Sequence, residues 1–156
     1  MKVFITADHG GFELKGQLYK FLTEHGFEVH DIGPYEYDAE DDYPVFANLL
    51  AETLLREGAD ENRGIIVCRS ATGVSIATNR HAGIRAAIAW DETVAKHSRE
   101  HNDSNILCLS GDYVGQDVNL QIAKVWLEEP FSNEERHKRR IDMIDPVAVE
   151  EVENAE

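Results

Sequence analysis

The chain of 156 residues has few cysteines and no long hydrophobic run, and each shortage excludes a class of protein. Cys68 and Cys108 have no CxxC spacing, so they give neither a disulfide framework nor a zinc site. No apolar run approaches the roughly 20 residues that a membrane-spanning helix needs. Met1–Asp8 is too short and too soon interrupted for a signal peptide. We therefore expect a reducing, cytoplasmic location and no membrane partner.

Basic residues are also scarce. The chain has 15 Lys and Arg against 30 Asp and Glu, which gives a net charge of −15. This balance argues against a nucleic-acid partner, because a phosphate backbone demands a basic surface. It does not exclude a small anionic substrate, since the local field inside a cleft matters more than the total charge. The basic residues concentrate at 136–140, whereas acidic residues gather at 36–42 and in a tail at 150–156, which we interpret as a solvated helix end.

Strand-like apolar runs alternate with helical patterns along the whole chain. The predicted strands are residues 3–7, 27–32, 64–68, 84–89 and 105–109. The predicted helices are one around 14–25, then 44–57, one ending near 80, then 92–100, 114–127 and a last one at 133–151. Five β–α repeats with short connections predict a parallel sheet between two layers of helices, an α/β fold with a C-terminal helix. With no linker or repeat, residues 1–156 are expected to form a single domain.

In such a sheet, ligands bind beyond the carboxyl ends of the strands. This rule selects four segments, which are residues 8–11, the loop after Cys68, residues 90–91 and residues 110–115. Most of the polar residues with chemical potential fall in these segments.

Asp8 and His9 follow the first predicted strand. A carboxylate beside an imidazole can share proton transfer, and histidine titrates near neutrality. Alternatively, Asp8 caps the following helix and His9 only binds the backbone. Both interpretations stay open from position alone. Gly10-Gly11 is not a GxGxxG, so no dinucleotide fingerprint is present and no cofactor is expected.

Cys68 begins the loop Cys-Arg-Ser-Ala-Thr-Gly at 68–73. Backbone amides and the positive end of the next helix are expected to lower the pKa of this thiol. The same amides can stabilise a developing oxyanion. The alternative is a buried structural cysteine, which is the interpretation we keep for Cys108 between two leucines.

His101 ends a predicted helix, at the sheet edge opposite Cys68. It is either a favourable partner for the helix dipole or a catalytic residue delivered to a neighbouring subunit. Arg136 and Arg140 share one helix face, where two guanidinium groups can grip a phosphate; a solvated basic face is the alternative. The histidines show no HExxH or comparable metal spacing, so no metal is expected.

Taken together, these residues resemble the B-type ribose-5-phosphate isomerases and the related galactose-6-phosphate isomerase subunits, from Val3 to about Ile144. Each matching segment is weak alone, but their order along the chain is that of the family. The matching segments are 7–15 (ADHGGFELK), 42–44 (DYP), 64–68 (GIIVC), 76–80 (IATNR), 83–87 (GIRAA), 100–107 (EHNDSNIL) and 136–140 (RHKRR).

The resemblance implies a Rossmann-like three-layer sandwich that forms a homodimer or a tetramer, with active sites shared across the dimer interface. It implies an aldose–ketose isomerase whose substrate is a small phosphorylated sugar, ribose 5-phosphate or a related one. The implied catalytic residues are Cys68, Asp8, His101 and Ser70. The implied substrate-binding residues are His9, Tyr43, Arg69, Ala71, Thr72, Gly73, Asn102, Arg136 and Arg140.

Roles follow from the same resemblance. Asp8 and His101 would open the sugar ring, and Cys68 would move a proton between C1 and C2 through a cis-enediolate. Backbone amides of 69–73 would hold the enediolate oxygen. A branch of the family uses a glutamate on this loop, but no Asp or Glu occurs between Cys68 and Asp91 here, which leaves Cys68 as the local base.

Two positions depart from the family pattern. The family loop usually reads Cys-Gly-Thr-Gly-x-Gly, and Arg69 and Ala71 stand here in place of two glycines. If either position needs a positive φ, the side chain costs about 1 kcal/mol. Arg69 also places a cation beside the thiol. Many members carry an arginine near the phosphate after strand five, where this chain has Asp112, a residue expected to repel a phosphate.

Three interpretations therefore remain. The first is an isomerase of a phosphorylated sugar. The second is an isomerase of the same fold that acts on a different sugar, whether phosphorylated or free. The third is a catalytically silent protein that binds sugar phosphates.

Overall fold

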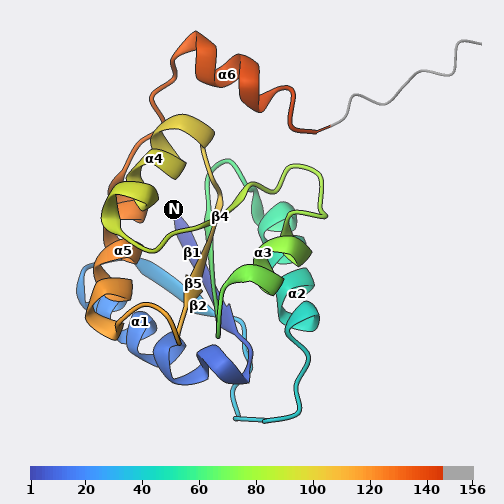
Figure 1. Cartoon of the computed structure of the whole chain (residues 1–156), viewed down its shortest axis with the longest axis vertical. Helices are drawn as coiled ribbons and strands as arrows, with labels where there is room; N and C mark the ends of the chain where they lie inside the picture. The colour runs from blue at the N-terminus through green and yellow to red at the C-terminus, as the bar shows by residue number, and fades with distance from the viewer. Residues whose placement is uncertain (146–156) are drawn as a thin grey trace, which may run out of the picture.

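The computed structural model describes residues 1–145 and contains a five-stranded parallel sheet in the order β2-β1-β3-β5-β4. The strands are β1 (Lys2–Ala7), β2 (Glu28–Asp31), β3 (Arg63–Cys68), β4 (Ala86–Ile88) and β5 (Ile106–Ser110). The helices are η1 (His9–Gly11, a 3-10 turn), α1 (Phe12–Glu24), α2 (Tyr43–Glu57), α3 (Thr72–Thr78), α4 (Glu92–Asn102), α5 (Gln116–Glu128) and α6 (Glu135–Ile141). Helices α1, α4 and α5 cover one face of the sheet, and α2 and α3 cover the other (Figure 1). The predicted three-layer α/β sandwich is confirmed.

The central strands are apolar because helices bury both of their faces. Along β1, Val3 and Ile5 pack in the core under α1 and α5, whereas Phe4 between them packs in the core under α2. The same alternation places Ile66 and Cys68 of β3 on the α2 face. The catalytic candidate Cys68 is therefore the last residue of a strand that is buried from Gly64 onward.

Several predicted boundaries were wrong by a few residues. Strand β4 is shorter than the predicted 84–89, and the Asn79 side chain brackets its start by bonding both backbone groups of Ala86 at 2.9 Å. The last helix starts at Glu135 because Asn133 has a left-handed φ of 57° and Glu134 is extended.

The C-terminal boundary also differs from the expectation. Helix α6 ends at Ile141, and residues 142–145 form a turn and a bend rather than the predicted continuation of the helix. The rest of the predicted helix, 146–151, and the acidic tail, 150–156, lie outside the described residues. Over residues 1–145, no helix is both long enough and apolar enough to cross a bilayer.

Candidate active site

The carboxyl ends of β1, β3 and β5 meet at one edge of the sheet, and backbone hydrogen bonds tie together the loops that follow them. The amide of Asp8 donates to the Val67 carbonyl at 3.2 Å, and the amide of Gly111 donates to the Cys68 carbonyl at 2.9 Å. The Ser110 hydroxyl donates to the Arg69 carbonyl at 2.5 Å. Hydrogen bonds thus hold the loops that carry Asp8 and Cys68 together at this edge of the sheet.

Glycine is required where η1 crosses β3. A Cβ at Gly11 would stand 2.3 Å from the Val67 carbonyl oxygen, so any side chain would push the turn off the strand. A Cβ at Gly10 would stand 2.4 Å from Cγ of Arg69. These two glycines let the backbone of Asp8 and His9 approach the Cys68 loop closely.

Asp8 is buried, and its Oδ1 accepts a hydrogen bond from the Gly11 amide at 3.1 Å. Burial raises the pKa of this carboxyl above 3.8, although the neighbouring His9 and the Gly11 amide pull it down. Asp8 caps the turn, as one interpretation of the sequence held. The Asp8 carboxyl can cap the turn and, because its pKa is raised, can also exchange a proton with a substrate. The capping and the catalytic interpretations are therefore compatible.

His9 makes a short contact with Asp41. Its Nδ1 lies 2.6 Å from Oδ1 of Asp41, and its backbone amide donates to the same oxygen at 3.1 Å. The hydrogen bond that the His9 ring donates to Asp41 is the main cause that raises the pKa of His9 above 6.5. Sequence reasoning missed Asp41 because it is one of several acids in the segment 36–42, and only the fold brings it to a residue 32 positions earlier.

The Cys68 thiol is buried, and its Sγ accepts the Ala71 amide at 3.1 Å. Burial raises the pKa of this thiol above 9.0, and the charge of Asp8 adds to the rise, whereas the loop amides oppose it. The expectation of a lowered pKa is therefore wrong: the predicted amides are in place, but desolvation outweighs them. Cys108 is fully buried, and desolvation raises its pKa as well.

Ala71 has a left-handed φ of 66° and stands immediately before α3. The conditional cost predicted for the lost glycine therefore applies at this position. The strained turn aims the Ala71 amide at the thiol and leaves Ser70 and Thr72 exposed at the rim.

Arg69 and Asp112 form an ion pair, with Nη1 and Oδ2 3.3 Å apart. The backbone amide of Asp112 also donates to the Arg69 carbonyl at 3.1 Å. Both side chains are well exposed. Asp112 was expected to repel a phosphate, but here its charge is balanced by the arginine that replaces a family glycine.

Tyr43 begins α2 and lies directly over Gly73 of α3. A Cβ at Gly73 would stand 2.8 Å from the tyrosine ring. The phenol is 42% exposed, so it borders the Cys68 loop and also faces solvent. A side chain at position 73 would therefore clash with Tyr43, which accounts for the glycine there.

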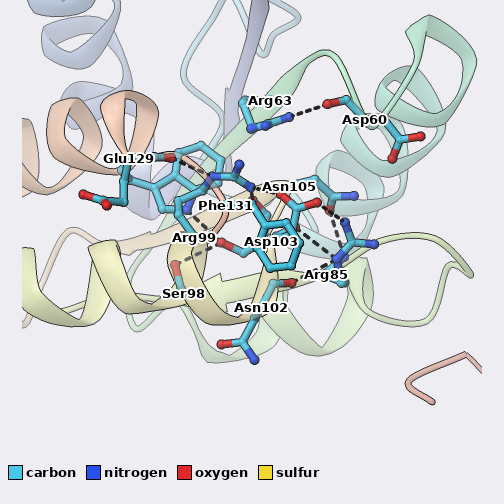
Figure 2. A network of polar contacts seen from close by, with 12 residues as sticks. Asp60, Arg63, Arg85, Ser98, Arg99, Asn102, Asp103, Asn105, Glu129 and Phe131 are labelled. Carbon is cyan, nitrogen blue, oxygen red and sulfur yellow. Dashed lines mark hydrogen bonds and ion pairs between the residues drawn. The ribbon is translucent and has the colours of Figure 1, made fainter. Parts of the chain in front are cut away.

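His101 and Asn102 lie at the opposite edge of the sheet, at the end of α4. An arginine–aspartate network fixes this helix end (Figure 2). Arg99 Nη1 lies 2.6 Å from Oδ1 of Asp103, and Arg85 Nε donates to the Asn102 carbonyl at 3.1 Å. The Asn102 carboxamide points away from the network and is exposed.

The basic cluster lies beside His101. The His101 ring packs on the His137 ring of α6, with centroids 4.7 Å apart. Arg136 and Arg140 are exposed on α6, and Arg136 Nε donates to Glu134 at 2.7 Å. The candidate site residues therefore form two groups at opposite ends of the strands, one around Cys68 at the end of β3 and one around His101 at the end of α4.

Residues 3–144 match the model of the family described as Ribose/Galactose Isomerase. The chain belongs to the ribose/galactose isomerase family. Among its relatives is a probable ribose-5-phosphate isomerase B of Mycoplasma genitalium, 39% identical over 142 residues that cover 91% of this chain and 92% of the relative. The ribose-5-phosphate isomerase B of Mycolicibacterium paratuberculosis is 35% identical over 92% of this chain and 89% of its own length.

Solved structures of the ribose/galactose isomerase family agree with the fold. The M. genitalium ribose-5-phosphate isomerase B, solved with bound ribulose-5-phosphate, superposes with a TM-score of 0.87 at 38% identity, covering 92% of this chain and 93% of that one. The enzyme of Thermotoga maritima gives a TM-score of 0.87 at 40% identity over 94% and 98% of the two chains. The resemblance and the Rossmann-like fold inferred from the sequence are confirmed, and the chain is an isomerase.

Proposed function

We propose that this isomerase interconverts ribose 5-phosphate and ribulose 5-phosphate by base catalysis at Cys68. The observation that carries the proposal is the placement of a buried thiol and a buried carboxyl, Cys68 and Asp8, on adjoining strand ends. Burial raises the pKa of both groups, and perturbed pKa values are typical of groups that exchange protons. The relatives named above, all ribose-5-phosphate isomerases B, support this choice of substrate.

Ring opening needs a proton taken from the anomeric hydroxyl and a proton given to the ring oxygen. Asp8 is suited to one of these transfers because its raised pKa keeps the two protonation states closer in energy. The second group is His101, which must come from another subunit because it lies at the far edge of its own sheet. We therefore include a dimer with shared sites in the proposal.

The isomerisation moves one proton from C2 to C1 and a second proton from the C2 hydroxyl to the C1 oxygen. The Cys68 thiolate removes the carbon-bound proton from C2 and returns it to C1, and the hydroxyl proton passes between the two oxygens, so the protein ends unchanged. The enediolate oxygen formed in between is negative, and the amides of the loop 69–73, that of Ser70 among them, are the donors available for it. The amide of Ala71 already points at the thiol in the free protein.

The phosphate requires cations at the far end of the sugar. Arg136 and Arg140 are exposed at i, i+4 on α6 and would reach the partner's site together with Asn102. Asp41 raises the pKa of His9, which favours the charged form of the imidazole, and Arg69 is a second cation on the subunit that holds Cys68. Tyr43, which contacts Gly73, and the exposed Thr72 border the Cys68 loop.

Substrate choice is tested with a panel of pentose and hexose phosphates and the corresponding free sugars, with turnover followed by the formation of the ketose. We expect turnover of ribose 5-phosphate and none of free ribose. Turnover of free sugars alone would replace the proposal with an isomerase of unphosphorylated sugars.

The cysteine base is tested with Cys68→Ala. We expect kcat to fall by about three orders of magnitude or more while the substrate still binds. Cys108→Ala is the matched control, because it removes the other buried thiol from the neighbouring strand. Equal rates for Cys68→Ala and the wild type would favour a different base, and absence of turnover in every protein would favour a silent sugar-phosphate-binding protein.

A further inference from the structure

Helix α4 carries two histidines and a glutamate on one face near its C-terminal end. The segment His97-Ser98-Arg99-Glu100-His101 has the order HxxEH, the reverse of HExxH. Histidines at i and i+4 of a helix are a common pair of zinc ligands. The sequence-based expectation of no metal-binding spacing among the histidines did not consider this reversed order.

The three side chains converge in the structure. One possible ligand atom from each of His97, Glu100 and His101 lies within 4.8 Å of the other two. Nε2 of His101 is 3.7 Å from Oε2 of Glu100, and the rings of His97 and His101 stack with centroids 4.8 Å apart. Two ligands of one tetrahedral Zn²⁺ stand about 3.4 Å apart, at metal–ligand distances near 2.1 Å. His97 is exposed and can change its rotamer, which is how we expect the remaining gap to close when the ion binds.

The neighbours of His101 restrict its position. The buried His137 packs against the His101 ring with its centroid at 4.7 Å, and its Nδ1 is held at 2.7 Å by the Ser132 hydroxyl. This packing limits the positions that His101 can adopt, so less order has to be imposed when a ligand binds.

The donor types select the metal. Two imidazole nitrogens and one carboxylate oxygen suit Zn²⁺, Ni²⁺ or Cu²⁺, whereas Mg²⁺ and Ca²⁺ prefer oxygen ligands. We propose that His97, Glu100 and His101 form a binding site for a transition-metal ion of the Zn²⁺ type, and that the bound ion inhibits the isomerase. Inhibition rests on the proposed function: coordination occupies the His101 nitrogen lone pair, so the imidazole can no longer take up a proton during ring opening.

The site is tested by isothermal titration of the full chain, without an affinity tag and freed of metal with EDTA that is then removed, with Zn²⁺ alone. The wild type is expected to bind about one ion per chain at this site. His97→Gln should weaken binding by about 100-fold, since the loss of even an outer-shell partner costs 10–100-fold. His25→Gln, which removes an exposed histidine from α1's end, is the matched control and should bind like the wild type.

A second cluster, Asp8, His9 and Asp41, also brings possible ligand atoms together, and it belongs to the site already described. Asp41→Asn removes a possible ligand of the second cluster alone, so it distinguishes Zn²⁺ binding there from binding at α4. Zn²⁺ binding that persists in His97→Gln and disappears in Asp41→Asn would overturn the assignment to α4. A wild type that binds no Zn²⁺ would overturn it as well.

Turnover is then measured with and without Zn²⁺. The wild type should lose activity as the ion binds and regain it with EDTA, whereas His97→Gln should keep the basal rate and lose at least tenfold in sensitivity to Zn²⁺. Binding at α4 that leaves wild-type turnover unchanged would overturn the inhibition. Basal turnover measured without metal tests the proposed function by itself, so the two failures are distinguishable.

Discussion

Nδ1 of His9 lies 2.6 Å from Oδ1 of Asp41, and the same oxygen accepts the His9 backbone amide at 3.1 Å. The aspartate side chain is 8% exposed, and its Oδ2 is buried without a hydrogen-bond partner among the described residues. One carboxylate therefore fixes both the position and the charge of His9. The imidazolium is favoured, which suits a residue that meets a phosphate.

We predict that Asp41→Asn lowers the pKa of His9. The hydrogen bond to Asp41 is the main cause that raises this pKa above 6.5, and an amide keeps the shape but removes the charge. In the wild type, affinity for the sugar phosphate should fall as pH rises through the pKa of His9. In the variant this fall should begin at lower pH, so that KM near neutrality increases more than kcat decreases.

The measurement is kcat and KM against pH, with the His9 ring titrated by NMR. Titration of the substrate phosphate is common to both proteins, so the difference between their profiles isolates His9. Asp38→Asn is the matched control, because Asp38 lies in the same acidic loop and its side chain accepts the Glu40 amide. Superimposable profiles for Asp41→Asn and the wild type would exclude a role for the His9 charge in binding. Because the folded pKa of His9 is raised, the pair stabilises the fold below pH 6.5, and this contribution disappears as pH rises through the folded pKa.

We predict that Asp8→Asn lowers the pKa of Cys68. The wild-type thiol has a pKa raised above 9.0, chiefly by burial and in part by the negative charge of Asp8. The variant removes that charge, so more thiolate should be present at a given pH. The Cβ chemical shift of ¹³C-labelled cysteine reports the titration, and the raised pKa of Cys108 keeps its signal apart. With Asp112→Asn, which removes a carboxylate paired to Arg69, the pKa of Cys68 should stay in place. An unchanged pKa in Asp8→Asn would mean that the two groups are not coupled.

Sequence patterns predicted the layers of the fold and the edge of the sheet that carries Asp8 and Cys68, because these depend on local periodicity and strand direction. They could not predict the sign of the Cys68 pKa shift, since the shift is a balance between desolvation and amide hydrogen bonds that only packing decides. Asp41 was invisible for a related reason. Nothing local distinguishes it from the other acids of its loop, and its partner His9 is reached only through the tertiary structure.

Ala71 offers a test of backbone strain beside the thiol. At φ 66° a β-branched residue is strongly disfavoured, and the side chain is completely buried. We predict that Ala71→Val costs about 2–4 kcal/mol of unfolding free energy, from strain together with overpacking. Ala71→Gly should lie within about 1 kcal/mol of the wild type, because relief of strain is offset by the lost methyl contact and by added chain entropy.

Urea unfolding checks these values. Ala77→Val is the control, since Ala77 lies in the last turn of α3 with an ordinary helical backbone, and this variant should cost less than Ala71→Val. Ala71→Val should also lower turnover more than Ala77→Val, because a shift of the backbone at position 71 moves the amide that donates to Sγ of Cys68. Equal losses at positions 71 and 77 would mean that the left-handed turn stores no strain.

The distance between His101 and Cys68 leads to the sharpest test of assembly. Within one chain these residues lie at opposite ends of the strands. Because both are proposed to be catalytic, neither Cys68→Ala nor His101→Asn is expected to be active by itself. If the sites are shared between two subunits, the two variants damage different components of each site. Random mixing of the variants then makes half of the dimers mixed, each with one intact site of two, and should restore about one quarter of wild-type activity.

The control for this mixing experiment is a pair of variants that damage the same half of the site. Cys68→Ala mixed with Asp8→Asn leaves every site of a mixed dimer defective, because both residues come from one chain and adjoining strands. This mixture should stay inactive after unfolding together and refolding, whereas the first should recover. Recovery in neither mixture would mean that His101 does not complete the site of a partner. Recovery only with His101→Asn, together with a dimeric mass by light scattering, requires that the imidazole acts across the interface.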